Sequence, residues 1–149
     1  METLFSNQDV DEIIRRINTL TQDSKAQWGK MNVSRMLAHC TVGLKMTTGE
    51  IKCKGNFFMQ LIGRMLKNKI IYKSEFRKNS PTAKEFIITD SDSFEEEKNA
   101  LIAYLKKFPE QGKNIVSSEP HPFFGKLTAE EYDRLQYKHL DHHLRQFGA

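Results

Sequence analysis

The sequence predicts an all-α protein, a helical bundle, and three observations lead to this fold class. Four long segments place apolar residues at the i, i+3, i+4 spacing that forms one face of a helix. The strict alternation of apolar and polar residues that marks a half-buried strand is nearly absent. The chain has 149 residues, 38% hydrophobic and 28% charged, so we expect one domain over residues 1–149 with a single core.

Two of the long helices are expected in the first third of the chain. One covers about residues 7–20, because Val10, Ile13 and Ile17 recur on one face. The other covers about residues 32–48 and carries a similar apolar stripe. Both stripes are expected to face the core.

An extra short helix and a long loop are expected between the second and third long helices. The segment "NFFMQLIGRML" (56–66) predicts a third, less regular helix. Asn79, Ser80 and Pro81 then break any helix and predict an extended loop. The segment "EFIITD" (85–90) fits either an isolated short strand or loop, and loop is the preferred interpretation.

The last two long helices each begin with a capping box, in which two side chains satisfy each other's backbone N–H groups. Ser93 and Glu96 open one helix, and Pro109 is expected to end it. Thr128 and Glu131 open the other, which is expected to run to about residue 147. Together these segments complete the predicted set of four long helices.

The positive charge of the chain is concentrated in one segment. The formal net charge is +4, and residues 52–84 are rich in Lys and Arg with Glu75 as the main opposing charge. The segment has no glycine-rich phosphate loop, zinc-finger spacing or RNA-binding aromatic pattern. A solvated surface and attraction of an anionic small molecule both remain open, while nucleic acid is not expected as a partner.

Cysteine content and apolar runs suggest where the protein works. The chain has two cysteines, Cys40 and Cys53, which is too few for a disulfide framework. No secretory signal is visible at the N-terminus, and no apolar run approaches the roughly 20 residues that cross a bilayer. We therefore expect a cytoplasmic protein with no membrane partner.

Three of the five histidines lie in "HLDHH" (139–143), on the last predicted helix. At about 100° per residue, His139 and His143 fall within about 40° of each other on the inward face, and His142 lies nearer its edge. Two imidazoles one helical turn apart can bind the same metal ion. A hydrogen-bonded polar network, or a solvent-facing cluster that responds to pH, would also explain the pattern.

A metal site would need a third ligand from another segment. His39 in "MLAHC" (36–40) is the main candidate, since it lies in the middle of the second predicted helix. His121, in a turn-rich loop, and Cys40, next to His39, are the alternatives. The helical wheel groups Cys40 with the core stripe rather than with His39.

With these residues in view, the chain resembles the DinB/YfiT-like superfamily of four-helix-bundle metalloproteins, and in particular an uncharacterised DinB-like family within it. Three blocks carry the resemblance: "WGKMNVSRMLAHC" (28–40), "FRKNSPTAKEF" (76–86) and "HPFFGKLTAEEYDRLQYKHLDHHLRQFG" (121–148). The last block is the most specific. The resemblance implies a divalent transition metal, zinc or nickel, held by His39, His139 and His143.

The resemblance also implies an activity. Several related proteins are transferases or isomerases that use a low-molecular-weight thiol, so we expect a metal-dependent thiol transferase that acts on a small electrophilic molecule. The basic segment suits an anionic one. From the residues themselves, Arg77 and Lys78 are candidates to guide an anionic thiol or substrate, and His142 and Tyr137 are lesser candidates for an acid–base partner. The alternatives are a metal-dependent hydrolase and a non-catalytic protein, with or without a metal, that acts through partners or as a homodimer.

Overall fold

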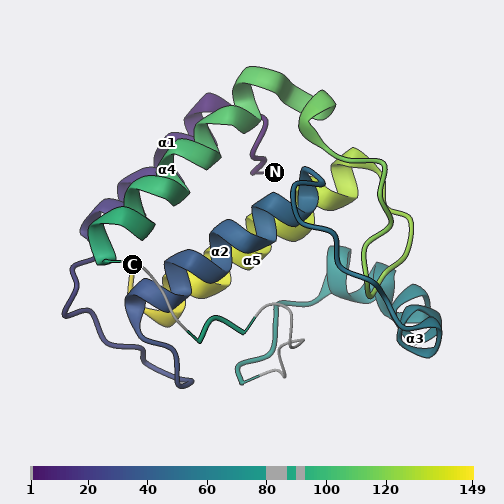
Figure 1. Cartoon of the computed structure of the whole chain (residues 1–149), viewed down its shortest axis with the longest axis horizontal. Coiled ribbons are helices and arrows are strands. Elements are labelled where there is room, and N and C mark those ends of the chain that lie inside the picture. Colours follow the sequence, from purple (N-terminus) through teal and green to yellow (C-terminus); the bar gives the residue numbers. More distant parts are fainter. Residues whose placement is uncertain (1, 80–86, 90–92) are drawn as a thin grey trace.

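The fold is all-α, as the sequence predicts (Figure 1). The computed structural model describes residues 2–79, 87–89 and 93–149, and within them the one β pairing is an isolated bridge between His121 and Gly125. The elements in chain order are α1 (Asn7–Thr19), α2 (Val33–Thr47), α3 (Phe57–Asn68), the π-helical turn η1 (Lys69–Lys73), α4 (Phe94–Gln111), the 3-10 turn η3 (Gly112–Ile115) and α5 (Ala129–Gln146).

The four long helices pack in neighbouring pairs. Helix α4 contacts α1 and α2, and α5 contacts the same two helices. Figure 1 shows α2 lying along α5 and α4 lying along α1. The apolar stripes form a main core between the helices, to which Ile13, Leu37, Leu105 and Leu140 contribute. The expectation of a single core is wrong, because Tyr132 and Leu135 of α5 belong to a second cluster, where they pack with Ile71 and Phe124 from the neighbouring connections.

Local sequence signals fix the starts of the helices. Both predicted capping boxes are present, Ser93 with Glu96 and Thr128 with Glu131. The prediction that Pro109 ends its helix is wrong, because α4 continues to Gln111. Pro109 supplies no N–H to the helix and its ring crowds the preceding turn, but the φ that the ring fixes is helical, and the chain continues for two more residues before the helix ends. The chain instead turns at Gly112, where φ is 58°.

Helix α3 and a long connection separate α2 from α4, as expected. Gly63 is the one buried residue of α3, and a Cβ placed there would lie 1.9 Å from the carbonyl oxygen of Phe123. The predicted break after the helix begins at Asn79, which has a left-handed φ of 57°. Ser80, Pro81 and half of residues 85–90 lie outside the described residues, and the described residues 87–89 form no strand. Among the described helices, none has the length and apolar character needed to cross a membrane.

Candidate metal centre

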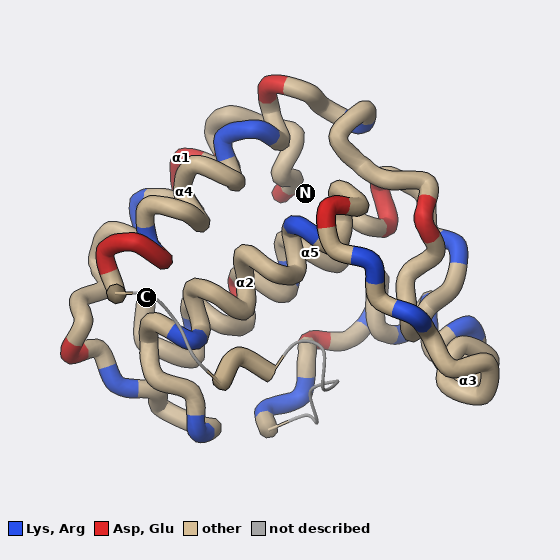
Figure 2. Tube along the Cα trace, viewed as in Figure 1, with Lys and Arg blue, Asp and Glu red and all other residues tan. Residues whose placement is uncertain are grey.

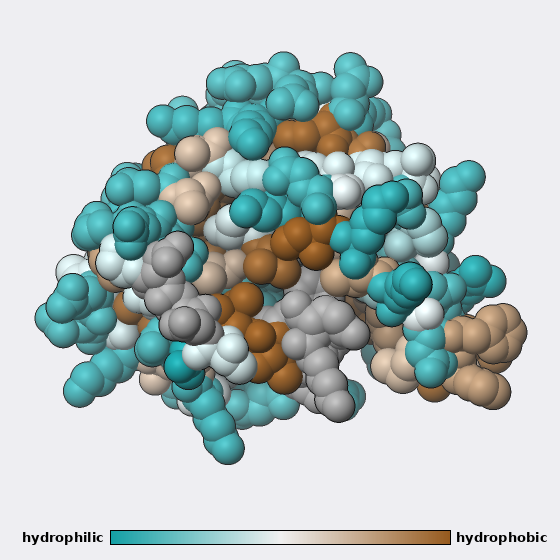
Figure 3. All heavy atoms as spheres, viewed as in Figure 1, coloured by the Kyte–Doolittle hydropathy of each residue, from teal (hydrophilic) through white to brown (hydrophobic). Residues whose placement is uncertain are grey.

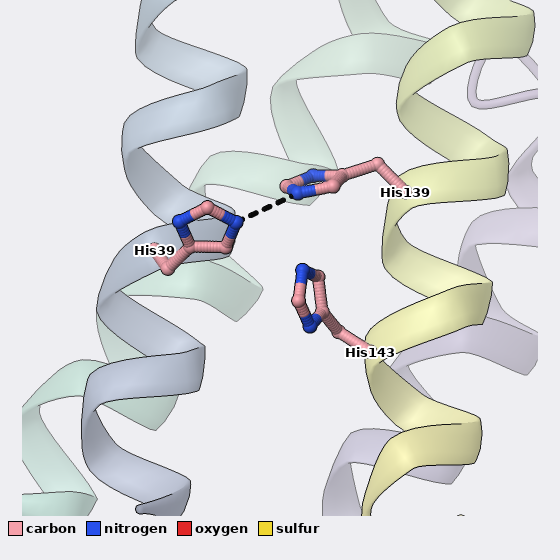
Figure 4. Close-up of side chains that lie close together, drawn as sticks. All are labelled: His39, His139 and His143. Atoms are coloured by element: carbon pink, nitrogen blue, oxygen red, sulfur yellow. Dashed lines mark hydrogen bonds between the residues drawn. The ribbon is translucent and has the colours of Figure 1, made fainter. Parts of the chain in front are cut away.

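Three histidines meet between α2 and α5. His39 comes from the middle of α2, and His139 and His143 come from successive turns of α5. One nitrogen from each ring lies within 4.8 Å of the other two. The Nε2 atoms of His39 and His139 are 2.8 Å apart, and Figure 4 shows all three rings directed into the space between the helices. The structure therefore brings together the three residues that the sequence put forward as ligands.

The ring of His143 is held in one orientation and one tautomer by Gln146. The Gln146 Nε2 donates to the carbonyl oxygen of Trp28 at 2.7 Å, which leaves Oε1 of the same amide as an acceptor. That Oε1 lies 2.8 Å from Nδ1 of His143, so Nδ1 carries the proton and donates it. Nε2 of His143 therefore presents a lone pair, and in Figure 4 a ring nitrogen of His143 faces the other two histidines.

His139 and Gln136 bring unpartnered polar atoms to the same place. Nδ1 of His139 and Oε1 of Gln136 are buried without a hydrogen bond in the described part of the chain. A Cβ on Gly43 of α2 would lie 3.2 Å from that Gln136 oxygen and 3.4 Å from the His139 ring. The absence of a side chain on Gly43 thus leaves room for both groups of α5 to approach α2.

Burial keeps the α5 histidines neutral. Burial, followed by the rings of His143 and His39, holds the pKa of His139 well below its usual value. Burial, helped by His39, lowers the pKa of His143 to about 3, against a small opposing effect from its bond to Gln146. Both rings are therefore uncharged near neutral pH, which is the form in which imidazole binds a metal.

The donor set and spacing fit a divalent transition ion. Zinc–nitrogen bonds of 2.0–2.1 Å in a tetrahedral site place ligand nitrogens about 3.3 Å apart. The pair at 2.8 Å would open by about 0.5 Å to reach that spacing, while nitrogens up to 4.8 Å apart would approach each other. Both changes would come from rotation of the side chains, mainly those of His39 and His139, since His143 is held by Gln146. Three imidazole nitrogens also suit zinc or nickel better than magnesium or calcium, which prefer oxygen ligands.

A pocket of about 830 Å³ opens beside the three histidines. Its walls are mainly apolar and include Trp28, Phe76 and Leu135. Lys30, Arg35 and Arg77 add positive charge to the lining. This volume accommodates a small molecule, and the lining combines apolar walls with a few charged groups, as in most ligand sites.

The remaining predicted site residues divide into those at the pocket and those elsewhere. His142 lines the pocket, where its ring lies edge-on to Trp28 with centroids 5.8 Å apart. Lys78 covers the Trp28 ring at 4.1 Å and does not line the pocket. The expectation that Tyr137 could act at the site is wrong, because its side chain packs against the core cluster instead.

Neither alternative third ligand joins the histidine group. His121 lines the pocket, but its Nδ1 accepts hydrogen bonds from the backbone N–H groups of Phe123 and Phe124 at 3.1 and 3.2 Å. Its other nitrogen therefore carries the proton. Cys40 is buried in the core cluster, as its wheel position predicts, and burial raises the pKa of its thiol.

Sequence reasoning missed the roles of Gly43, Gln136 and Gln146 at the site. A signal for two of them was present, because Gln136 and Gln146 each lie three residues from a predicted ligand and so share its helix face. No comparable signal marks Gly43, since its close approach to α5 depends on how two helices pack.

The fold and the site define a class: an all-α protein with a three-histidine cluster beside a pocket. The chain belongs to the family described as "Protein of unknown function (DUF1569)", whose model matches residues 3–149. No curated protein and no solved structure matches the chain.

Proposed function

We propose that this protein is a metal-dependent enzyme of the DinB/YfiT-like superfamily and that its four long helices form the four-helix bundle of that group. His39, His139 and His143 would hold a divalent zinc or nickel ion. The observation that carries the proposal is the convergence of three ring nitrogens from two adjacent helices, with Gln146 turning the lone pair of His143 inward. Such an orienting hydrogen bond is typical of histidines that bind metals.

Three protein ligands favour a catalytic site over a structural one, because structural zinc sites have four. A divalent ion held by His39, His139 and His143 would lower the pKa of a bound water or thiol and would so supply a nucleophile near neutral pH. The chain itself would hold the proton on Nδ1 of His143 through Gln146 and limit water through Trp28, Phe76 and Leu135. Lys30, Arg35 and Arg77 suit an anionic substrate or thiol.

Transfer of a low-molecular-weight thiol to a small electrophile is the reaction that we favour. The mainly apolar pocket supports this choice over hydrolysis, because apolar walls limit the bulk water that would compete with a thiol for the electrophile. His142 lines the pocket and is the nearest candidate for moving a proton. We also propose a cytoplasmic location, which fits two cysteines that form no disulfide.

Metal analysis tests the proposal directly. The wild-type protein and the variants His39→Ala, His143→Ala and His142→Ala would be purified without a tag and their metal content measured. We expect one transition-metal ion per wild-type chain, loss of the ion in the first two variants and retention in His142→Ala. The last is the matched control, because His142 lies on the same helix and lines the pocket but is outside the three-histidine group.

Two outcomes would count against a metalloenzyme. One is a wild-type protein that binds no zinc, nickel, manganese or iron after reconstitution. The other is an equal loss of metal in all three variants with unchanged circular dichroism. Metal binding without thiol transfer or hydrolysis on a panel of small electrophiles would favour the alternative, a non-catalytic metal-binding protein.

A further inference from the structure

Helix α3 exposes large apolar side chains, unlike the long helices of this protein. Phe57, Phe58 and Met65 are 74%, 72% and 80% exposed, and Leu61 and Ile62 are about half exposed. In Figure 3 the region of α3 is the brown-tinted projection at the lower right. Contiguous apolar surface of this kind marks a site of contact with another molecule.

Two contacts hold the side of α3 that faces the rest of the protein, so the helix cannot rotate about its axis to bury its apolar side chains. Gly63 lies directly on the backbone of Phe123, and Lys67 forms an ion pair with Glu131 of α5 at 2.8 Å. At about 100° per residue, Leu61 and Met65 lie about 160° away from Gly63, on either side of the opposite pole. These two residues mark the centre of an outward-facing apolar surface.

The segment that carries this apolar surface is positively charged and has no acidic residue. Between Ile51 and Ser74 the chain has six Lys or Arg residues and no Asp or Glu. Figure 2 shows blue positions along the segment that leads into α3. Lys52 pairs with Glu119 and Lys67 with Glu131. Four others form no ion pair within the described part of the chain: Lys54, Arg64, Lys69 and Lys73.

We propose that α3 adsorbs to a membrane surface that contains anionic lipid, with Leu61 and Met65 at the centre of the inserted face. An apolar face bordered by cations is the pattern of helices that lie in the bilayer interface, where acyl chains receive the apolar residues and anionic head groups receive the charges. Such a helix needs no membrane-crossing span. The proposal departs from the expectation, drawn from the sequence, that no membrane takes part.

A second copy of the chain fits this surface less well. A helix of 12 residues is about 18 Å long, and half of its surface is on the order of 300 Å², well below the roughly 800 Å² per partner of a stable interface. Pairing α3 with α3 would also bring two cationic segments together without an opposing charge.

Sedimentation with lipid vesicles tests the proposal on the full chain. Wild-type protein would be mixed with vesicles of phosphatidylcholine alone and of phosphatidylcholine with phosphatidylserine. The double variant Leu61→Ser/Met65→Ser removes the apolar centre, and Lys54→Gln/Lys69→Gln removes two cations. The control Lys25→Gln/Lys106→Gln removes two exposed cations that lie outside this segment. Thermal melts of all variants should match wild type, because every substituted side chain is exposed.

We expect binding of wild-type protein to the anionic vesicles and little binding to the neutral ones. The serine variant should lose binding, and the glutamine variant at positions 54 and 69 should lose about 30-fold in affinity, about fivefold per cation, while the control loses much less. Equal binding to both vesicles, or to neither, would overturn the proposal. Self-association of wild-type protein in light scattering, absent in the serine variant, would assign the surface to a second copy instead.

Discussion

Replacing Gln146 tests whether the orientation of His143 is part of a metal site. In the folded protein this side chain accepts the Nδ1 proton of His143 at 2.8 Å and donates to the Trp28 carbonyl at 2.7 Å. Gln146→Leu keeps the volume and removes both hydrogen bonds. Each lost bond leaves a partner unsatisfied at about 1–3 kcal/mol, so for two bonds we expect about 2–6 kcal/mol of lost stability.

A measurement of metal affinity distinguishes orientation of His143 by Gln146 from a purely structural role of Gln146. Loss of an orienting hydrogen bond typically lowers metal affinity by about 10–100-fold, which is our expectation for Gln146→Leu. Gln146→Glu keeps an acceptor for His143 while losing the bond to Trp28, so it should lose stability but retain affinity. Competition with a chromophoric chelator would give the affinities, and urea unfolding of metal-free protein would give the stabilities.

A suitable control loses a buried hydrogen bond away from the site. Thr41→Val removes the bond from the Thr41 hydroxyl to the Leu37 carbonyl on α2, and it should lower stability without changing metal affinity. The reasoning would be refuted by two results: equal affinities of wild type and Gln146→Leu, or an equal drop in the Leu and Glu variants. Either would show that Gln146 supports the fold and does not set the tautomer of a ligand.

Two further predictions concern the HPFFG turn. Burial lowers the pKa of His121 to about 4, below the roughly 6.5 of an unfolded chain, so the unfolded state binds the proton more readily. This difference in pKa contributes up to about 3 kcal/mol of stability above about pH 6.5, and the contribution is lost as the pH falls towards 4. The free energy of unfolding of His121→Asn, measured with urea, should therefore depend less on pH than that of wild type. Gly63→Ala places a Cβ 1.9 Å from the Phe123 carbonyl oxygen, so it should lower the free energy of unfolding by about 1–3 kcal/mol and speed hydrogen exchange in α3. Unchanged hydrogen exchange and an unchanged melting temperature would contradict this packing.

Local patterns in the sequence predicted the long helices because their signals are local. The stripes of α1 and α5 repeat at helical spacing, and the pairs Ser93–Glu96 and Thr128–Glu131 fix two helix starts within a few residues. Pro109 misled because proline weakens a helix without always ending it at that residue, and α4 runs on to Gln111. The exposure of α3 was not predictable, since its apolar residues fit a packed helix equally well and the contact with Phe123 comes from a distant segment.

The candidate site was predictable only for the residues that share a helix or a family motif. The spacing of His139 and His143 is a property of one helix, whereas their approach to His39 depends on how α2 packs against α5. The same holds for Gln146, whose role depends on the carbonyl of Trp28, far away in the sequence. Contacts between segments leave no periodic trace, so no count of spacing could reveal them.

The distribution of unsatisfied polar atoms supports a ligand site at this place. Buried polar groups in native proteins are nearly always hydrogen-bonded, because leaving one unpaired is costly. Among the described residues, the buried side-chain atoms without a partner belong to Trp28, Gln136 and His139. All three residues line the pocket beside the histidines, while the core between the long helices has none. An indole N–H, an amide oxygen and an imidazole nitrogen left without partners in one pocket are what we expect if the proposed ligand supplies their missing interactions.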